Sequence, residues 1–347
     1  MKQKWMLVAL ALLALVALPL VGCKNDSVSE PVSGTEQPTP EQPTPGQPAP
    51  VTYTVTANDV ASVIEGLSGV APHTLVATGE WTDGFSTLAE ALKKDESKKV
   101  NLDLSGVERL ETIGESAFYE CKSLTSISLP STVTTIEYDA FNSCSNLATV
   151  TFGEGSKLET IGQRAFSECS SLTSISLPSS VTSIGSYAFR YCEDLAEVTF
   201  GEGSKLETIG QRAFSECSSL TSITIPSSVT TIEARAFQIC EDLAEVTFGE
   251  GSKLETITNE AFYKCSSLTS ITIPASVTTI EARAFQSCEK LAEVTMEATV
   301  PPTLGSSAFS NTSTGLQILV PNVVNYTNEA AKEKGWEPYQ EKIKLID

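Results

Sequence analysis

One short motif returns at nearly constant intervals along most of this 347-residue chain, and it restricts the possible folds more than any other feature. An Ala-Phe pair occurs nine times, and successive phenylalanines lie 23, 25, 23, 25, 23, 25, 23 and 24 residues apart. These residues are Phe118, Phe141, Phe166, Phe189, Phe214, Phe237, Phe262, Phe285 and Phe309. Because so short a unit cannot bury its own apolar side, the units must stack as a solenoid.

Each unit also has an internal pattern. In the first eight units a cysteine follows the phenylalanine by three residues, and a leucine follows the cysteine by three more. The leucine opens a segment such as 124–129, where Ile127 and Leu129 alternate with serines as in a strand that is buried on one side. The spacing of Ala140, Phe141 and Cys144 fits a helical turn. We therefore predict one parallel sheet in which each strand pairs with the next, with short turns or helices opposite.

This pattern resembles the BspA-like, or treponemal-type, leucine-rich repeat of bacterial surface proteins, L-x-x-I-x-L-P-x-x-V-T-x-I-G-x-x-A-F-x-x-C. Residues 172–192 match it almost letter for letter, and the resemblance extends from Leu102 to about Ala308. Every second unit departs from it by replacing Leu-Pro with Phe-Gly-Glu-Gly, which adds two residues, and the ninth unit lacks the cysteine. The resemblance implies a leucine-rich-repeat solenoid with its sheet on the concave face, and adhesion to host matrix proteins or other bacteria.

The first fifty residues read as an export and anchoring segment. Residues 6–21 are uncharged and almost all apolar, which is too short a run to span a bilayer but suits a signal peptide. The following Leu20-Val21-Gly22-Cys23 resembles a lipobox, which implies cleavage before Cys23 and a lipid on its thiol; an ordinary signal peptide is the alternative. We expect a lipoprotein signal peptide at 1–22 and a lipid anchor with a Pro-rich, extended linker at 23–50. The protein would then be displayed at the bacterial envelope, on the outer-membrane surface.

Both ends of the repeat region need a cap, because an open solenoid end exposes apolar side chains and unpaired backbone. We predict an α/β cap at 51–99, nine repeats over 100–315 and a second cap at 316–347. The predicted elements of the first cap are strands at 52–55 and 74–77 and helices at 58–67 and 82–94. Those of the second are a last strand at 316–320, a helix at 329–334 that stops at Gly335, and a lid containing Trp336 and Tyr339.

The outward positions of the strands form the candidate ligand-binding surface, with hydroxyls and carboxylates along it. The candidates are Ser126, Ser128, Thr149, Thr151, Ser174, Ser176, Glu197, Thr199, Ser222, Thr224, Glu245, Thr247, Ser270, Thr272, Glu293 and Thr295. Residues 146–175 and 194–223 agree at 28 of 30 positions, including exposed ones that packing does not constrain. Such repetition of one patch favours polymeric or clustered ligands through avidity.

Several chemistries fit the sequence poorly. A formal charge of -20 disfavours nucleic acid, and we expect membrane contact only through the lipid. The repeat cysteines are spaced too widely for a metal site; we expect buried thiols, and some disulfides stay possible. The Gly-Glu-Gly-Ser-Lys segments read as turns. His73 is the one histidine in the chain and is no candidate for catalysis, so we expect neither a metal nor a cofactor.

These observations favour a non-enzymatic adhesin that recognises host extracellular-matrix proteins or bacterial surface proteins. The alternative is a passive surface scaffold or variable antigen without a defined ligand. An enzyme that acts on glycans is the least favoured reading. It would use Glu197, Glu245 and Glu293, which two-rung spacing places about 9.5 Å apart, a separation found in inverting glycosidases. A row of solvated carboxylates explains the same residues more simply.

Overall fold

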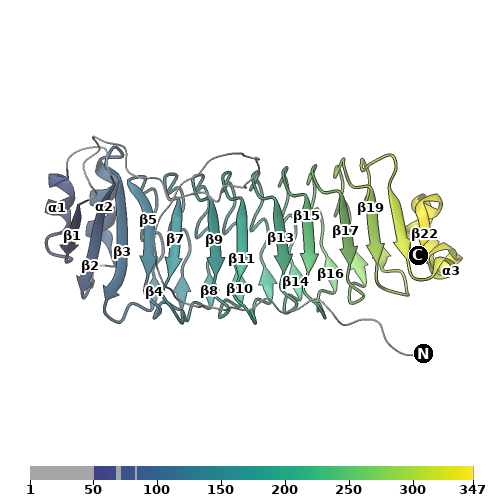
Figure 1. The fold of residues 1–347 in the computed structure, drawn as a ribbon, viewed down its shortest axis with the longest axis horizontal. Coiled ribbons are helices and arrows are strands. Elements are labelled where there is room, and N and C mark those ends of the chain that lie inside the picture. Colours follow the sequence, from purple (N-terminus) through teal and green to yellow (C-terminus); the bar gives the residue numbers. More distant parts are fainter. Residues whose placement is uncertain (1–50, 68–71, 83, 347) are drawn as a thin grey trace, which may run out of the picture. The chain divides into compact units, whose positions relative to one another are not determined.

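The computed structural model describes residues 51–67, 72–82 and 84–346. These residues form a solenoid of stacked rungs, in which the strands of one side follow one another in chain order (Figure 1). The predicted parallel repeat architecture is thereby confirmed. The expected signal peptide, Cys23 and linker fall in residues 1–50, outside the described residues, so those expectations stay untested. In the described ranges no helix has the length and apolar character needed to cross a bilayer.

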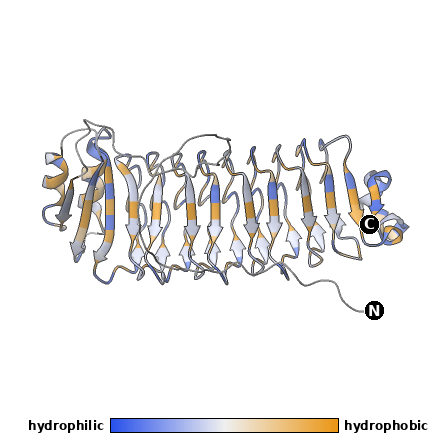
Figure 2. Cartoon of the chain, in the orientation of Figure 1, coloured by the Kyte–Doolittle hydropathy of each residue, from blue (hydrophilic) through white to orange (hydrophobic). Residues whose placement is uncertain are grey.

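One side of each rung carries a strand, and we call this side the strand face. Its strands are β3 (Val100–Val107), β5 (Leu124–Leu129), β7 (Thr149–Phe152), β9 (Ser174–Leu177), β11 (Glu197–Phe200), β13 (Ser222–Ile225), β15 (Glu245–Phe248), β17 (Ser270–Ile273), β19 (Glu293–Met296) and β21 (Gln317–Val320). Figure 2 shows a hydrophobic band along the middle of this row. The strands of this face contain apolar residues such as Ile175 and Val198, whose side chains point into the core and are at most 5% exposed.

A second, narrower ladder closes each rung. Its two-residue strands are β4 (Thr112–Ile113), β6 (Thr135–Ile136), β8 (Thr160–Ile161), β10 (Ser183–Ile184), β12 (Thr208–Ile209), β14 (Thr231–Ile232), β16 (Thr256–Ile257), β18 (Thr279–Ile280) and β20 (Thr303–Leu304). They pair in parallel as one nine-stranded sheet. The sequence does not predict this sheet, because two residues are too few to show a strand periodicity.

The segment around each repeat phenylalanine is a turn rather than a helix. Residues two before and two after the phenylalanine adopt left-handed backbone angles, as Arg212 (φ 54°) and Glu216 (φ 64°) do on either side of Phe214. This alternation points alternate N–H groups at the next rung, where the Phe214 N–H donates to the Ala236 carbonyl over 2.8 Å. The sequence predicts either short turns or short helices opposite the strands, and the described repeats contain turns.

The nine repeat phenylalanines form one continuous buried column. Neighbouring rings are nearly parallel, within 3–9°, and their centroids lie 5.1–5.4 Å apart. Phe85 extends the column at its N-terminal end, and Tyr339 meets Phe309 edge-on at the other. The column therefore runs through all nine repeats and meets an aromatic residue of the cap at each end.

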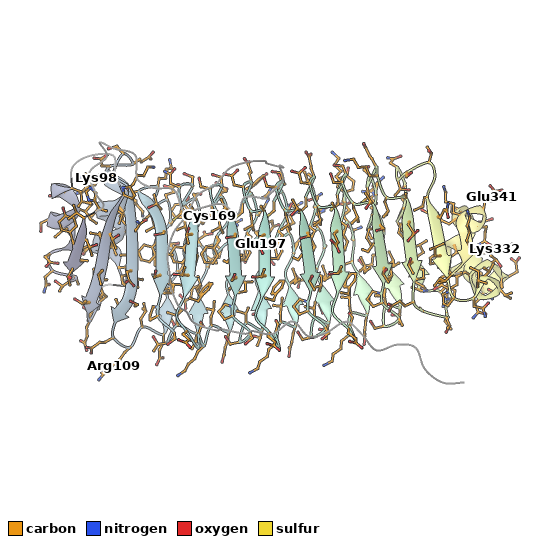
Figure 3. All side chains as sticks on the ribbon, in the orientation of Figure 1. Lys98, Arg109, Cys169, Glu197, Lys332 and Glu341 are labelled. Carbon is orange, nitrogen blue, oxygen red and sulfur yellow. The ribbon has the colours of Figure 1, made fainter. Side chains whose placement is uncertain are left out.

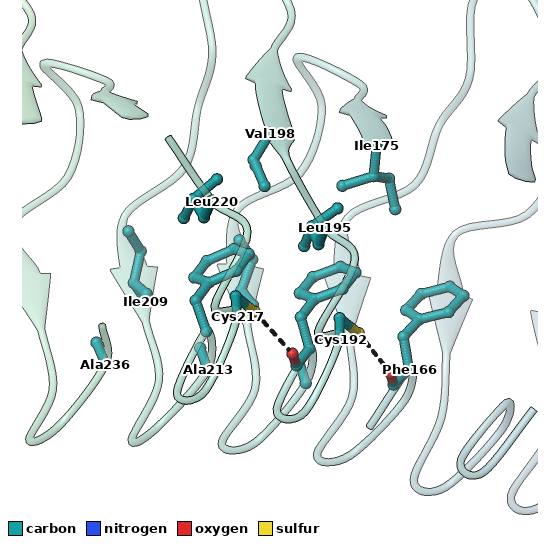
Figure 4. Packing of buried hydrophobic residues seen from close by; sticks show 14 of the residues in the cluster. Phe166, Ile175, Cys192, Leu195, Val198, Ile209, Ala213, Cys217, Leu220 and Ala236 are labelled. Atoms are coloured by element: carbon teal, nitrogen blue, oxygen red, sulfur yellow. Dashed lines mark hydrogen bonds between the residues drawn. The ribbon is translucent and has the colours of Figure 1, made fainter. Parts of the chain in front are cut away.

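The repeat cysteines line this column as free, buried thiols. In seven of them the thiol donates to the carbonyl of the phenylalanine one rung earlier, at 2.9–3.2 Å, as Figure 4 shows for Cys192 and Cys217. Burial raises the pKa of the Cys121 and Cys240 thiols to about 12, so these thiols stay protonated at neutral pH. No cluster of metal-ligating side chains occurs among the residues described.

At the N-terminal end, a small α/β unit continues the strand face. It contains β1 (Thr52–Val55), α1 (Val60–Gly66), β2 (His73–Gly79) and α2 (Ser86–Lys94), and its two strands extend the sheet in the order β1-β2-β3-β5-β7. Both helices begin a few residues later than the sequence predicts. The helices cover the apolar end of the stack, since Ile64 and Leu92 are buried in the same core as the repeats.

At the C-terminal end, the predicted last strand is followed by one more. After β21 come α3 (Val323–Thr327), α4 (Glu329–Ala331), a π-helical turn at Lys332–Trp336, a 3-10 helix at Glu337–Lys342, and β22 (Ile343–Leu345), which pairs in parallel with β21. Trp336 is buried and its indole N–H donates to the Pro302 carbonyl over 2.7 Å. The Tyr339 hydroxyl accepts the Phe309 N–H, which has no further rung to bond.

Candidate binding surface

The sixteen candidate residues all lie along the strand face, where Figure 3 labels Glu197 on β11. Thirteen of them are exposed, and the other three, Ser126, Ser128 and Thr295, are half-buried. The predicted outward orientation of the row is therefore correct. The alternation of buried and exposed residues along each four-residue strand produces this arrangement, because successive side chains point to opposite faces.

Between β5 and β19 the strands of this face are joined in pairs, which the sequence does not predict. Four residue pairs connect each of β5–β7, β9–β11, β13–β15 and β17–β19. Between those pairs the ladder opens: β11 and β13 share one residue pair, and no ladder joins β7 to β9 or β15 to β17. The expectation that every strand pairs with the next is thus wrong at alternate junctions. Each open junction follows a strand that ends in the longer Phe-Gly-Glu-Gly loop.

Hydroxyl groups bond one another inside the strand pairs. The Thr199 hydroxyl donates to Ser176 over 2.9 Å, and the hydroxyls of Thr224 and Thr247 lie 2.8 Å apart. The corresponding bond between Thr151 and Ser128 is 3.0 Å long. These bonds fix the rotamers of exposed hydroxyls and so reduce the side-chain entropy that a ligand would otherwise have to remove on binding.

At each open junction the surface is hollowed, so that three equivalent hollows recur along the face. The first, between β7 and β9, has a volume of about 620 Å³. The second lies between β11 and β13 (about 470 Å³), and the third between β15 and β17 (about 560 Å³). Their lining residues correspond, since Phe152, Phe200 and Phe248 lie 48 residues apart in the sequence.

Twelve of the sixteen candidates line the hollows. They are Thr149, Thr151, Ser174 and Ser176 in the first, Glu197, Thr199, Ser222 and Thr224 in the second, and Glu245, Thr247, Ser270 and Thr272 in the third. Ser126, Ser128, Glu293 and Thr295 lie outside them. Each hollow thus combines a half-buried phenylalanine ring with several hydroxyls, and the second and third add a carboxylate where the first has Thr149. The third is the most acidic, because Glu250 and Glu297 also line it.

The wall of each hollow is the Gly-Glu-Gly-Ser loop, which the sequence identified as a turn but not as part of the site. Its first glycine packs against the preceding rung: a β-carbon at Gly201 would lie 2.7 Å from the Ser179 nitrogen. Its second glycine, Gly203, has a φ of +68°, which glycine adopts without strain. Recurrence of this loop at the period of the surface patch, in every second unit, is the signal that could have identified it.

The face offers little for catalysis. Glu197, Glu245 and Glu293 are exposed, and the hollows that hold the first two are open grooves rather than apolar pockets that would make one carboxyl an acid. His73 is buried on β2 in the N-terminal cap, away from the hollows. Hydroxyls, carboxylates and an aromatic ring in an open groove can hold a ligand by hydrogen bonds and stacking.

Comparison with known proteins identifies the repeat. The family model "BspA type Leucine rich repeat region" matches residues 97–218 and 207–331. Among solved structures, a leucine-rich repeat protein from Bacteroides ovatus is 26% identical (TM-score 0.49; 68% of this chain and 64% of that one). The T. pallidum leucine rich repeat protein TpLRR is 27% identical (TM-score 0.40; 56% and 78%). This chain thus spans under two thirds of the B. ovatus protein's length. A search of curated proteins finds no significant match.

Proposed function

Because this chain belongs to the BspA type leucine-rich repeat family, we propose that it is a non-enzymatic binding protein displayed on the bacterial surface. The proposed activity is that of an adhesin that holds host matrix proteins or other bacteria through the strand face. Cys23 would carry the lipid that anchors it to the outer membrane, with residues 23–50 as the spacer. No catalytic step is part of this proposal.

The repetition of the hollows is the observation that carries the proposal. Three grooves with the same ring, hydroxyls and loop follow one another along one face, and a repetitive partner can occupy several at once. Weak individual contacts are then sufficient, because linked sites multiply their affinities when the geometry allows simultaneous engagement. The carboxylates of the second and third hollows favour a ligand with basic or hydroxyl-rich segments.

The test replaces one equivalent hydroxyl in each hollow by lysine: Thr151→Lys, Thr199→Lys and Thr247→Lys in one full-length chain. The expected result is a loss of at least about tenfold in binding to immobilised matrix proteins or to partner bacteria, because each lysine fills a hollow and adds a positive charge to it. Melting should be unchanged, since all three side chains are exposed.

A matched control carries Thr112→Lys, Thr231→Lys and Thr303→Lys, three exposed threonines of the narrow ladder. This control makes the same three Thr→Lys substitutions on another side of the rungs. It should bind matrix proteins or partner bacteria as tightly as the unaltered chain does. Equal attachment by both triple variants would contradict the adhesin and support the passive scaffold. Glycan turnover that depends on Glu245 would support an enzyme instead.

A further inference from the structure

Arginine is concentrated on one side of this acidic protein. Five of the six arginines lie in the turns that carry the phenylalanine column, although the chain has a formal charge of -20. Four of them, Arg164, Arg212, Arg235 and Arg283, occupy the same left-handed position two residues before a phenylalanine. Backbone geometry therefore aligns them as a column along the solenoid, on a surface that the strand face does not share.

Three of the guanidinium groups surround a single aromatic ring. The central carbon of Arg164 lies 5.8 Å from the Tyr187 ring centroid, that of Arg212 lies 5.7 Å away, and that of Arg190 lies 5.6 Å away. Cation–π attraction within about 6 Å holds such groups in place without neutralising them. We call Tyr138, Arg164, Tyr187, Arg190, Tyr191 and Arg212 the Arg–Tyr cluster.

Most hydrogen-bond donors of this cluster are unused. Among the residues described, neither Arg164 nor Arg212 has a carboxylate within 4.0 Å, whereas Arg190 pairs with Glu216 at 3.3 Å. Arg164 donates one hydrogen bond, to the Tyr138 hydroxyl over 2.9 Å. The Nε atoms of Arg190 and Arg212 are buried without a described partner. A guanidinium carries five N–H donors in a planar fork that matches oxyanions, so these groups form an incomplete site.

The next repeat shows what a completed site looks like. In the third copy of the two-rung unit, Glu260 stands where the first two copies have Arg164 and Arg212. This carboxylate is 8% exposed and bonds the Arg235 Nε at 2.7 Å and the Arg283 Nη1 at 3.3 Å. Those two hydrogen bonds, with that from Arg235 the stronger, hold the pKa of Glu260 below its ordinary value despite its burial. In this column, a carboxylate between two arginines is therefore bound by both of them.

We propose that the Arg–Tyr cluster binds the sulfate groups of an acidic polysaccharide. The sulfate oxygens would accept the unused N–H donors of Arg164 and Arg212, as the Glu260 carboxylate does one repeat further on. The cluster runs along the solenoid over four consecutive rungs, which suits a linear polyanion that touches it and leaves the acidic remainder in solvent. A flat anionic bilayer would bring that remainder close as well and be repelled.

The experiment titrates full-length protein with a heparin-derived octasaccharide, using Arg164→Gln with Arg212→Gln. We expect at least a tenfold weaker association and a smaller dependence on salt, because two charged contacts are lost. The matched control is Lys157→Gln with Lys205→Gln, two exposed lysines that have the same 48-residue spacing and charge change but lie in the loop beside the strand face. The control should bind within twofold of the unaltered chain.

Arg164→Lys with Arg212→Lys provides a second variant that keeps both charges and the side-chain stems. It should lose affinity by a smaller factor, because an ammonium cannot offer the paired donors of a guanidinium. Absence of octasaccharide binding, or an equal loss in the lysine control, would overturn the proposal. So would equally tight, arginine-dependent binding to phosphatidylserine vesicles, which would indicate a membrane contact. Attachment through the strand face should be unchanged in every one of these variants, so the two proposals can fail separately.

Discussion

The two sides of each rung differ in period. Around the phenylalanine column every rung repeats the one before it, with ring centroids 5.1–5.4 Å apart at all eight steps and a thiol bonded to the preceding carbonyl at seven. On the strand face the repeat is two rungs long, because strands join in pairs and the three hollows lie between the pairs.

This difference separates what stabilises the protein from what it can recognise. Each buried ring contacts the ring before and after it, so packing imposes the same residue on every unit. Packing does not constrain the exposed residues of the strand face in this way. They can therefore repeat with the period of the duplicated two-rung unit. Changes to the column should therefore affect stability, and changes to the face should affect binding.

Alkaline pH should have the largest effect, and up to about pH 9.5 it acts mainly on the thiols of the column. Burial raises the pKa of seven repeat thiols, from Cys121 to Cys265, above their value in the unfolded chain, and to about 12 for Cys121 and Cys240. The folded state thus retains protons that the unfolded state releases above about pH 8.5, so stability is complete below that pH and falls as pH rises towards the folded pKa. The loss approaches 1.4 kcal/mol per pH unit for each thiol exposed on unfolding.

Urea denaturation between pH 8.5 and 9.5 measures this loss, in a range where most tyrosine side chains are still protonated. A Cys240→Ala chain should show a shallower dependence of its unfolding free energy on pH, because one titrating thiol is gone. A free energy of unfolding that does not change over this range would contradict the buried-thiol column. The hollows contain no cysteine, so ligand binding should change only where the fold is lost.

The next largest effect is expected from replacing a phenylalanine of the column, compared with replacing one on the strand face. Phe214→Ala should cost about 3 to 5 kcal/mol, because it leaves a cavity between two stacked rings. Phe200→Ala, at the half-buried base of the second hollow, should cost less than about 2 kcal/mol but weaken ligand binding. Chemical denaturation and a binding assay on both variants separate the two. Equal costs would mean that the strand face carries as much of the stability as the column does.

The smallest effect is expected for exposed polar residues of the second and third hollows. Ser222→Ala and Glu245→Gln should each change the free energy of unfolding by less than about 0.5 kcal/mol, because both side chains are in contact with solvent. Differential scanning calorimetry checks this, with Phe214→Ala as the positive control. A drop of several kcal/mol for either variant would show that these side chains serve packing, and the face would lose its role as a separate binding surface.

Sequence periodicity accounts for much of the fold and for the orientation of the candidate site. The spacing of Phe and Cys predicts the stack and its buried column, and the alternation around Ile175 predicts which strand residues face outward. It could not show that strands pair in twos, nor that a further strand, β22, follows β21. Both features depend on contacts between rungs or with the cap. The residue pattern within one unit does not predict such contacts.

The sequence by itself therefore determined a leucine-rich-repeat solenoid. The reason is that the same pattern of apolar positions recurs in every unit and can be read from a single unit. Only the tertiary structure decided where surface chemistry converges. The hollows join the loop after one strand to the strand of the next rung. The Arg–Tyr cluster contains direct bonds between distant residues, such as Arg164 and Tyr138, which lie 26 positions apart. Side chains so distant in sequence meet only once the rungs are stacked in register.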